Sequence, residues 1–475
     1  MQQEQQKAYQ EKRIEHWDSV ASHPFSMNLG GYYHKRLRDI YQFLVPSGQR
    51  ILELGCGKGD LLAALRPSYG VGIDFSGQML NSAKNKYPEL SFIQDDATSF
   101  ALSETFDFII VSDLFNDVWD VQSILEHLKS NCHSQTRIIT NFYSKLWQPI
   151  LMFGQKVGFA RPVLPQNWFT VEDLTNLYKL SGFEIFRCWQ EVLLPLQVPL
   201  LSNFCNKFLS KLWPLNNLNL TNFIVARVAE VEQEQKEYSV SVIIPARNES
   251  GNIPAIFERI PQMGHFTELI FVEGHSSDNT AEVIQTEIQQ HPDVKCRFFR
   301  QNGTGKGDAV RQGFEAASGD VLMILDADLT VPPETLPRFY KALVSGKGDF
   351  INGVRLVYPM DKEAMRFFNF LGNKFFSIAF SWLIGQPVKD TLCGTKVFFK
   401  RGYWLIAANR SYFGEFDPFG DFDLLFGAAR FNFRIVDMPV RYAERKYGTT
   451  NIQRWKHGVL LLRMVLFASR LIKFI

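Results

Sequence analysis

The sequence lacks most of the features that mark secreted, zinc-scaffolded or membrane-spanning chains. Its six cysteines are scattered over 475 residues without a C-x-x-C pair, which argues against a structural zinc site and a disulfide framework. No uninterrupted apolar run reaches the length of about 18 residues that a membrane-spanning helix needs. The polar N-terminus also has no apolar signal-peptide core. We therefore expect a chain of the reducing cytoplasm.

A strong charge of either sign is also missing. Lysine and arginine number 51 against 49 acidic residues, which leaves a net charge of +2. No large field therefore favours binding to nucleic acid. The hydrophobic fraction of 46% is ordinary for a globular protein, but phenylalanine is frequent, with 42 residues that cluster in the second half.

Length and periodicity predict two α/β domains. A chain of 475 residues exceeds the size at which one hydrophobic core stops growing. Apolar strands alternate with helical stretches over residues 49–228, which is typical of a doubly wound α/β domain. A charged stretch follows, and a second α/β series begins with the β-branched run S-V-S-V-I-I-P-A. The expected domains are residues 1–230, with an N-terminal helix, and residues 239–475, with an amphipathic C-terminal helix, joined by a linker at residues 231–238.

A glycine-rich turn follows the first strand, in R-I-L-E-L-G-C-G-K-G-D. Gly55, Gly57 and Gly59 would let the backbone turn tightly and approach a ligand, although G-x-G-x-G alone also occurs in dinucleotide-binding folds. Glu53 places an acid inside the strand end, where a buried charge needs a reason. Asp74 closes the next strand, where a carboxylate can accept hydrogen bonds from ribose hydroxyls. Two later strands end at the same edge, in D-D-A and V-S-D.

Together these segments resemble the class I S-adenosylmethionine (SAM)-dependent methyltransferases, over residues 50–228. The resemblance implies a seven-stranded Rossmann-like sheet with SAM at the carboxyl ends of its strands. The implied SAM contacts are Glu53, Gly55, Gly57 and Gly59 at the methionine part, Asp74 at the ribose, Asp96 and Ala97 at the adenine, and Ser112 with Asp113 beside the transferred methyl group.

The residues do not identify the methyl acceptor. Methyl transfer needs mainly the proximity of a nucleophile to the SAM sulfonium. The sequence does not identify a general base, because His127 and His133 also fit ordinary surface or core positions. Thr170 and Asp173 form a capping pattern that predicts a helix, in a region where members of the resembled family often cover the acceptor. A SAM-binding domain without catalytic activity, or one that has lost its ligand, stays open.

Two carboxylates stand one residue apart at the end of an apolar strand, in D-V-L-M-I-L-D-A-D-L-T-V-P-P. Like charges at this spacing repel and raise each other's pKa. A hard divalent cation, Mg²⁺ or Mn²⁺, would remove that cost at Asp326 and Asp328 and would bridge a diphosphate. The metal would then stabilise a leaving nucleoside diphosphate. Two earlier strands of this half end at Pro245 and Glu273.

These segments resemble the family 2 glycosyltransferases of GT-A fold over residues 239–453, and D-A-D-L-T-V-P-P is similar to the dolichyl-phosphate mannose synthase branch. The resemblance implies a nucleotide-sugar donor and a polyprenyl phosphate acceptor. Glu273 and Gly274 stand where that branch has two adjacent acids, so the base or sugar preference is in doubt. The implied donor contacts are Pro245, Ala246, Glu249, Glu273, Lys306, Asp326, Ala327 and Asp328, with Asp326 and Asp328 at the metal. Arg355 and Arg445 are implied near the acceptor, where arginine's fork suits a phosphate.

A hydroxyl acceptor would need a carboxylate to accept its proton. The first candidates are Asp421 and Asp423 in F-G-E-F-D-P-F-G-D-F-D, with Asp390 behind them. That stretch also fits a solvated loop with buried rings. If the acceptor is a phosphate, its oxygen is already a nucleophile and no strong base is required.

Two segments are amphipathic enough to lie in a membrane interface. In residues 367–385, the polar residues Asn369, Asn373, Ser377 and Ser381 fall four apart on a Phe-rich helix. Near the C-terminus, Lys456, Arg463 and Arg470 fall seven apart on an apolar helix. Helices buried against the domain, or a dimer interface, are the alternatives.

The sequence thus predicts a bifunctional transferase, peripheral on the cytoplasmic face of a membrane. It would glycosylate a lipid-linked or other membrane acceptor and methylate the product or a related molecule. One alternative is a glycosyltransferase with a non-catalytic SAM-binding domain. Another is a non-catalytic interaction protein, against which Asp326 and Asp328 argue. The sugar, the nucleotide base, both acceptors and the oligomeric state are not predicted.

Overall fold

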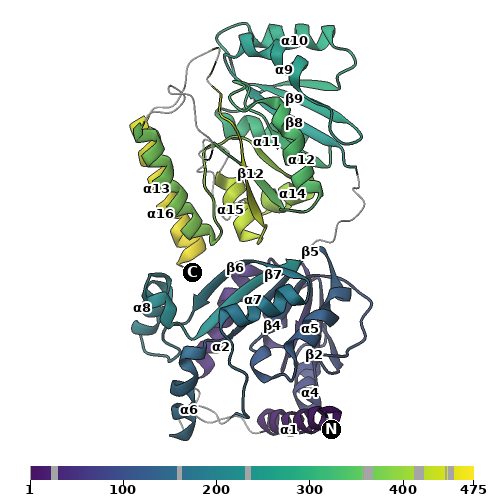
Figure 1. Ribbon diagram of the computed structural model, residues 1–475, viewed down its shortest axis with the longest axis vertical. Helices are drawn as coiled ribbons and strands as arrows, with labels where there is room; N and C mark the ends of the chain where they lie inside the picture. Colours follow the sequence, from purple (N-terminus) through teal and green to yellow (C-terminus); the bar gives the residue numbers. More distant parts are fainter. Residues whose placement is uncertain are drawn as a thin grey trace. The chain divides into compact units, whose positions relative to one another are not determined.

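Two compact α/β units make up the chain in the computed structural model. The structure describes residues 2–22, 30–157, 163–229, 237–355, 357, 367–410, 422–443, 445, 447 and 454–474. Residues 1–229 with 474–475 form the first unit and residues 230–473 the second. Each unit contains one seven-stranded sheet (Figure 1), so the predicted α/β class with two sheets is confirmed.

The first sheet has the strand order β3-β2-β1-β4-β5-β7-β6. Strands β1 to β5 are parallel, whereas β7 runs antiparallel to both β5 and β6. The central strands are apolar because helices cover both faces of a parallel sheet. The strands are β1 Arg50–Leu54, β2 Tyr69–Asp74, β3 Ser91–Gln94, β4 Phe106–Ser112, β5 Cys132–Tyr143, β6 Phe183–Glu191 and β7 Thr221–Val228.

Three helices in the described part of the first unit, α4, α5 and α7, begin at side-chain caps. Asp120 caps α5 and Ser76 caps α4 through backbone N–H groups. The predicted capping box is confirmed: Thr170 and Asp173 exchange hydrogen bonds of 2.8 and 3.2 Å at the start of α7. The α-helices are α1 Gln2–Ser22, α2 Gly30–Leu44, α3 Asp60–Ala64, α4 Gly77–Lys86, α5 Val121–Leu128, α6 Gln148–Lys156, α7 Val171–Leu180 and α8 Leu201–Lys207, with short 3₁₀ turns η1 Phe115–Asp117, η2 Lys129–Asn131, η3 Lys145–Trp147, η4 Leu209–Lys211 and η5 Leu215–Leu218.

The second sheet has the order β10-β9-β8-β11-β13-β12-β14. Its strands are parallel except β13, which runs antiparallel to β11 and β12. The carboxyl ends of β8, β9 and β11 therefore share one edge of the sheet, and ligands bind at such an edge in open α/β folds. The strands are β8 Val240–Ala246, β9 Thr267–Glu273, β10 Cys296–Arg300, β11 Val321–Ile324, β12 Phe350–Val354, β13 Lys396–Phe399 and β14 Ile435–Pro439.

The helices of this unit flank the sheet and include the two predicted amphipathic segments. They are α9 Ile253–Arg259, α10 Thr280–Gln290, α11 Lys306–Ala316, α12 Leu336–Val344, α13 Phe367–Ile384, α14 Lys400–Ala408, α15 Phe422–Arg430 and α16 Arg454–Ala468, with 3₁₀ turns η6 Ser250–Asn252 and η7 Pro333–Thr335 and a π-helical turn η9 Ser469–Lys473. None of the helices in the described part of the chain is long and apolar enough to cross a membrane.

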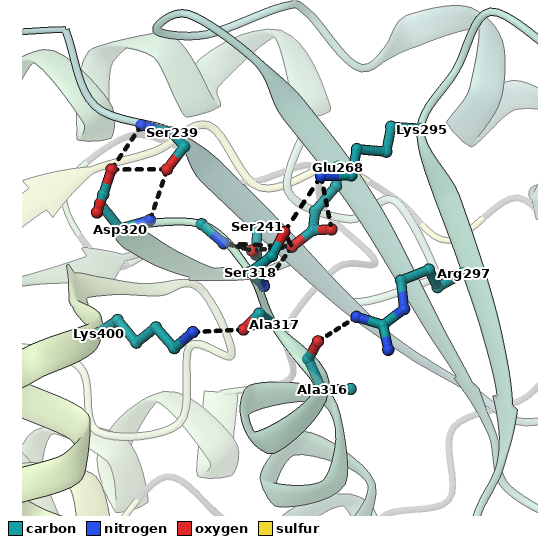
Figure 2. Close-up of polar contacts among 11 residues, drawn as sticks. Ser239, Ser241, Glu268, Lys295, Arg297, Ala316, Ala317, Ser318, Asp320 and Lys400 are labelled. Atoms are coloured by element: carbon teal, nitrogen blue, oxygen red, sulfur yellow. Dashed lines mark hydrogen bonds and ion pairs between the residues drawn. The ribbon is translucent and has the colours of Figure 1, made fainter.

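A polar network holds the loop that leads into β11 at its amino end (Figure 2). The buried Glu268 carboxylate accepts hydrogen bonds from Ser241 Oγ at 2.5 Å and from the Ser318 amide and hydroxyl at 2.6 and 2.8 Å. Burial alone would raise the pKa of Glu268, but these donors outweigh it and the pKa is lowered. Lys400 Nζ donates to Ala317 O at 2.6 Å beside it. The network fixes the strand whose other end carries Asp326 and Asp328.

Helices α13 and α16 lie side by side (Figure 1). The part of the α13 polar stripe that is described faces the protein: Ser377 Oγ donates to Val388 O at 2.8 Å, and Val388 N donates to Ser381 Oγ at 2.9 Å. The exposed face is apolar instead, because Phe375 is 57% and Ile378 71% exposed. The helix is thus buried on its polar stripe and uncovered on an apolar one.

Candidate functional site

The glycine-rich turn joins β1 to α3 at the carboxyl edge of the first sheet. Gly55, Gly57 and Gly59 all have positive φ, at 68°, 53° and 73°, which only glycine adopts readily. A Cβ at Gly57 would meet nothing within 4 Å, so the backbone there faces open space. The Gly57 amide donates to Asp74 Oδ2 at 2.8 Å, and the Ser76 amide donates to Asp74 Oδ1 at 2.9 Å. Burial raises the pKa of Asp74, and these two amides partly offset the effect.

Glu53 lies directly before this turn and is 3% exposed. Burial raises the pKa of Glu53 well above its ordinary value, although the Leu62 backbone opposes this. Its Oε2 atom is buried without a hydrogen-bond partner among the described residues, which is costly unless a ligand supplies one. A methionine ammonium group would satisfy this oxygen, so the residues present fit SAM.

The predicted adenine residues lie in a pocket that the N-terminal helix covers. Asp96 Oδ2 accepts a hydrogen bond from Gln10 Nε2 at 2.8 Å, and Asp96 Oδ1 accepts one from the Thr98 amide at 2.7 Å. Helix α1 is fixed there because Arg13 Nε donates to Asp117 Oδ1 at 2.9 Å. The pocket is lined by Tyr9, Gln10, Arg13, Phe75, Asp96, Ala97, Thr98, Leu114, Asp117, Val118, Trp119 and Ile124. The contribution of α1 was not predicted, because its polar sequence gives no period.

Asp113 follows β4, is half-buried, and contacts two buried polar side chains. Its Oδ1 atom accepts hydrogen bonds from Tyr33 Oη at 2.9 Å and from Asn141 Nδ2 at 2.6 Å. Burial raises the pKa of Asp113 to about 7, and both donors oppose the rise. The predicted Ser112 donates to Asn141 Oδ1 at 2.8 Å. Tyr33 and Asn141 were missed by sequence reasoning, since they come from α2 and β5, far from β4 in the chain.

In the second unit, each aspartate of the D-x-D pair holds a cationic side chain. Lys306 Nζ at the start of α11 lies 2.6 Å from Asp326 Oδ1, and Arg445 Nη2 donates to Asp328 Oδ2 at 2.6 Å. Burial would raise the pKa of Asp326, but Lys306 outweighs it and the pKa is lowered. Ala327 between the two acids is buried.

Arg445 also reaches the loop that follows β8, the first strand of this unit. Its Nη1 atom donates to Glu249 Oε1 at 3.1 Å, while Asn252 Nδ2 donates to Glu249 Oε2 at 2.7 Å. Burial raises the pKa of Glu249 to about 7, against the lowering effect of Arg445. Arg445, which is predicted near the acceptor, therefore bridges Glu249 and Asp328, two residues that are predicted at the donor.

The remaining predicted donor residues lie along the same edge. Ala246 and Glu273 are register partners at the ends of β8 and β9, with Pro245 one residue earlier. Glu273 Oε1 accepts a hydrogen bond from the Ser276 amide at 2.5 Å. Gly394 was not predicted: a Cβ there would lie less than 3.0 Å from Asp326 Oδ2 and from Lys306 Nζ. The role of Gly394 follows only from its position against the Asp326–Lys306 pair, and the sequence does not reveal that position.

A divalent cation fits the chemistry of the two aspartates. Their oxygens are hard ligands, and Mg²⁺ sites commonly combine one or two carboxylates with substrate phosphates. Lys306 and Arg445 pair with the two carboxylates in this structure. No group of three or more His, Cys, Asp or Glu side chains placed to hold a metal occurs among the described residues, so donor phosphates would have to complete the ligand set.

The three acids predicted as proton acceptors have different surroundings. Asp390 is 1% exposed and accepts two hydrogen bonds from the Arg355 guanidinium, at 2.7 and 2.8 Å, and one from the Arg355 amide at 3.1 Å. Arg355 outweighs the effect of burial and lowers the pKa of Asp390. Before Asp390 could accept a proton, this ion pair would have to open, whereas the N–H groups of Arg355 that do not contact Asp390 could still bind a phosphate. Asp423 is buried in α15, 3.5 Å from Arg410 Nε, and Asp421 lies outside the described residues.

Comparison with known families finds one match within each unit. Residues 51–134 match the family model described as a methyltransferase domain, and residues 241–403 match the one described as glycosyl transferase family 2. Both predicted resemblances are confirmed by these matches.

Individual relatives match parts of the chain. The dolichol-phosphate mannosyltransferase of Saccharomyces cerevisiae is 39% identical over 22% of this chain and 40% of its own length. The undecaprenyl-phosphate 4-deoxy-4-formamido-L-arabinose transferase of Pectobacterium carotovorum is 29% identical over 45% of this chain and 62% of its own. The chain thus spans less than two thirds of these curated relatives. A SAM-dependent methyltransferase from Mesorhizobium loti aligns with a TM-score of 0.31 at 18% identity, over 40% of this chain and 96% of that one.

Proposed function

We propose that this chain, which joins a methyltransferase domain to a family 2 glycosyltransferase domain, is a bifunctional transferase. It would transfer a sugar from a nucleotide-diphospho sugar to a polyprenyl phosphate or another lipid-linked acceptor, and methylate the product or a related molecule with SAM. The observation that carries the first activity is the arrangement of Asp326, Asp328 and Lys306 at the carboxyl edge of the second sheet. The names of the polyprenyl-phosphate relatives support the acceptor class.

In the glycosyltransferase unit, the cluster of charges would exchange partners when the donor binds. Lys306 would turn from Asp326 to the donor phosphates, and Arg445 would leave Asp328. A bound Mg²⁺ or Mn²⁺ would supply positive charge to the leaving diphosphate. Glu249, Glu273, Pro245 and the neighbouring Ala246 would line the nucleoside pocket.

A phosphate acceptor suits the state of Asp390. A phosphate oxygen attacks without giving up a proton, so the reaction does not need the carboxylate that Arg355 occupies. Asp390 would then act as a positioning residue that fixes the Arg355 guanidinium. Asp421 and Asp423 remain candidates for a hydroxyl acceptor only.

Substitution of Asp326 tests the donor site. Asp326→Asn should abolish metal-dependent donor hydrolysis and sugar transfer, because it removes one hard ligand and the partner of Lys306. Asp293→Asn, at an exposed turn residue of the same unit, is the matched control. Equal hydrolysis by wild type and Asp326→Asn would contradict the metal assignment.

In the methyltransferase unit, SAM would lie over the glycine turn, with Glu53 at its ammonium group and Asp74 at its ribose. Ala97 would contact the adenine. Asp113 would accept the proton of a hydroxyl acceptor, because its pKa of about 7 suits a general base near neutral pH. Calorimetric titration with SAM tests the cofactor site, and Asp74→Ala should weaken binding.

Catalysis is tested separately from binding. Asp113→Asn should retain SAM affinity but lose methyl transfer to the glycosylated product. Wild-type protein that binds SAM and transfers no methyl group to any candidate would instead indicate a regulatory SAM-binding domain.

We further propose that α13 and α16 place the glycosyltransferase unit on the cytoplasmic face of a membrane. Their uncovered face carries Phe375, Ile378, Leu462 and Leu466, all 45% or more exposed, and the exposed Arg463 lies beside Leu462. Such a combination binds bilayer interfaces. Ile378→Glu should lower transfer to a vesicle-borne acceptor while leaving donor hydrolysis unchanged.

A further inference from the structure

The methyltransferase unit has a separate apolar surface that the proposed activities do not use. It is formed by the exposed hydrophobic side chains of residues 146–157 and 196–218, and we name it the α6–α8 surface. Its most exposed members are Leu200 at 88%, Trp213 at 81%, Phe153 at 67%, Leu146 at 62%, and Ile150 and Leu218 at 54% each. More than half of the exposed large hydrophobic side chains of the described residues belong to it. Soluble proteins rarely leave so much apolar surface uncovered without a binding partner.

The two halves of this surface are connected. Trp147 Nε1, directly before α6, donates a hydrogen bond to Leu218 O of η5 at 2.8 Å. Helix α8 continues through η4 into η5, and α6 and α8 lie on the same side of the unit (Figure 1). The exposed side chains therefore belong to one region and are not scattered singly.

The charge of this region is of one sign. No Asp or Glu occurs from residue 144 to 171 or from 192 to 229. Lys145, Lys156 and Lys207 are exposed there. Apolar side chains with lysines and without acids complement a bilayer that contains anionic lipids.

A cationic group also lies beneath this region. Lys211 of η4 is buried and contacts Glu191, and Arg36 Nη2 of α2 lies 3.7 Å from the same carboxylate. Burial, Arg36 and Arg187 together lower the pKa of Lys211, against the effect of Glu191. Lys211 and Arg36 thus balance the Glu191 carboxylate, so this buried acid does not oppose binding of the apolar side chains to an anionic surface.

The surface lies next to the methyl-transfer edge of the sheet. Two adjacent residues of α2 connect them: Tyr33 donates to Asp113 at 2.9 Å, and Tyr32 Oη donates to Asn203 Oδ1 of α8 at 3.3 Å. The α6 half of the surface is connected through Tyr143, whose ring at the end of β5 lies 5.9 Å from the Tyr33 ring. Tyr143 precedes the start of η3 by two residues. Both halves of the surface therefore begin at the edge where Asp113 sits.

We propose that the α6–α8 surface binds an anionic lipid bilayer, so that the methyl acceptor is a lipid-linked molecule that reaches Asp113 from the membrane. The acceptor class rests on the proposed methyltransferase function, whereas the bilayer contact does not. A surface that rests on the membrane beside the catalytic edge brings a lipid-borne group to SAM without extracting the lipid from the bilayer.

Vesicle binding of the full chain tests the contact. Phosphatidylcholine vesicles with phosphatidylglycerol should bind the protein, and the double variant Phe153→Glu with Leu200→Glu should weaken binding by about tenfold or more, since two large apolar side chains leave the interface. Leu180→Glu, at a 62% exposed leucine of α7 outside the surface, is the matched control and should bind as wild type. Unchanged binding by the double variant would overturn the proposal, as would equal wild-type binding to vesicles of phosphatidylcholine alone.

Fluorescence quenching gives a local measurement that does not depend on the double variant. Brominated lipids in the anionic vesicles should quench wild-type tryptophan emission, and Trp213→Phe should remove part of that quenching. Trp404→Phe, at a 47% exposed residue of α14, should leave it unchanged. Quenching that does not depend on Trp213 would overturn the proposal.

Two further outcomes separate this proposal from others. A concentration-dependent dimer that Leu200→Glu dissociates, without vesicle binding through Trp213, would assign the surface to a second copy and overturn the bilayer contact. SAM titration of the double variant should match wild type, which shows that the fold is intact. If the wild-type chain bound no SAM, the methyltransferase function would fail while the vesicle measurements still decided the surface.

Discussion

At the scale of single residues, Gly394 leaves no room for a side chain next to the donor site. Its hydrogen faces the Asp326–Lys306 pair so closely that a Cβ would come within 3.0 Å of both side chains. Gly394→Ala should therefore displace the pair and lower sugar transfer by about 100-fold, the size of effect that an error of about 1 Å produces in a catalytic site. Transfer rates are the measurement. Gly372→Ala, where a Cβ meets nothing within 4 Å, should retain activity, and full activity in both variants would refute the close fit.

Asp113 makes a prediction about pH. Burial raises the pKa of this carboxyl to about 7, so the group is protonated below that pH and cannot accept a proton there. Methyl transfer to a hydroxyl acceptor should rise as the pH increases through about 7 and then level off. The pH profile of methyl transfer, with SAM saturating, measures this. Tyr33→Phe removes one donor to the carboxylate and should shift the rise to higher pH; a profile that is flat in wild type would exclude Asp113 as the base.

Residues at strand ends were predictable, whereas their partners were not. Glu53, Asp74, Asp326 and Asp328 follow apolar strands, so the sequence places them at the carboxyl edge of a parallel sheet. The hydrogen bonds of Asp113 to Tyr33 and Asn141 join three distant segments, and no local pattern reveals such contacts. For the same reason the sequence could not predict the pairing of Asp390 with Arg355, although it identified each of them as a candidate site residue.

At the scale of elements, the Glu268 network fixes the start of β11. Glu268→Gln should destabilise the second unit by about 2 kcal/mol, because it weakens hydrogen bonds to a charged acceptor. The pKa of Glu268 is lowered in the fold. Its contribution is therefore present above the ordinary pKa of 4.5 and is lost as the pH falls through the folded pKa.

Urea unfolding at neutral and at acidic pH measures this contribution. Wild type and Glu268→Gln should differ at neutral pH and converge under acidic conditions, where both side chains are uncharged. Glu282→Gln, at an exposed residue of α10, is the control and should unfold like wild type at both pH values. A difference between wild type and Glu268→Gln that persists in acid would mean that the charge is not the stabilising feature.

For helix α13, the sequence pattern predicts the helix but not the face that packs against the protein. The four-residue spacing of Asn369, Asn373, Ser377 and Ser381 predicted a helix with one polar stripe; the helix is present, and Ser377 and Ser381 share a stripe on it. The periodicity alone could not say which stripe faces the protein. Ser377 and Ser381 point inward because the backbone of Val388 offers them hydrogen-bonding groups, and apolar residues are left outside.

At the scale of the whole molecule, two sites in one chain raise a question about the order of the reactions. Tethering gives an intermediate from one site an effective concentration of roughly millimolar order at the other, which benefits the cell only if one product is the other's substrate. If the glycosylated lipid is the methyl acceptor, Asp326→Asn should remove both a hexose-sized and a methyl-sized mass from the lipid product. Asp113→Asn should leave the hexose-sized mass and remove only the methyl-sized one. Mass spectrometry of lipids from cells that carry each variant distinguishes these products. A methylated lipid without sugar in Asp326→Asn cells would reverse the order, because the methyl group would then be transferred before the sugar.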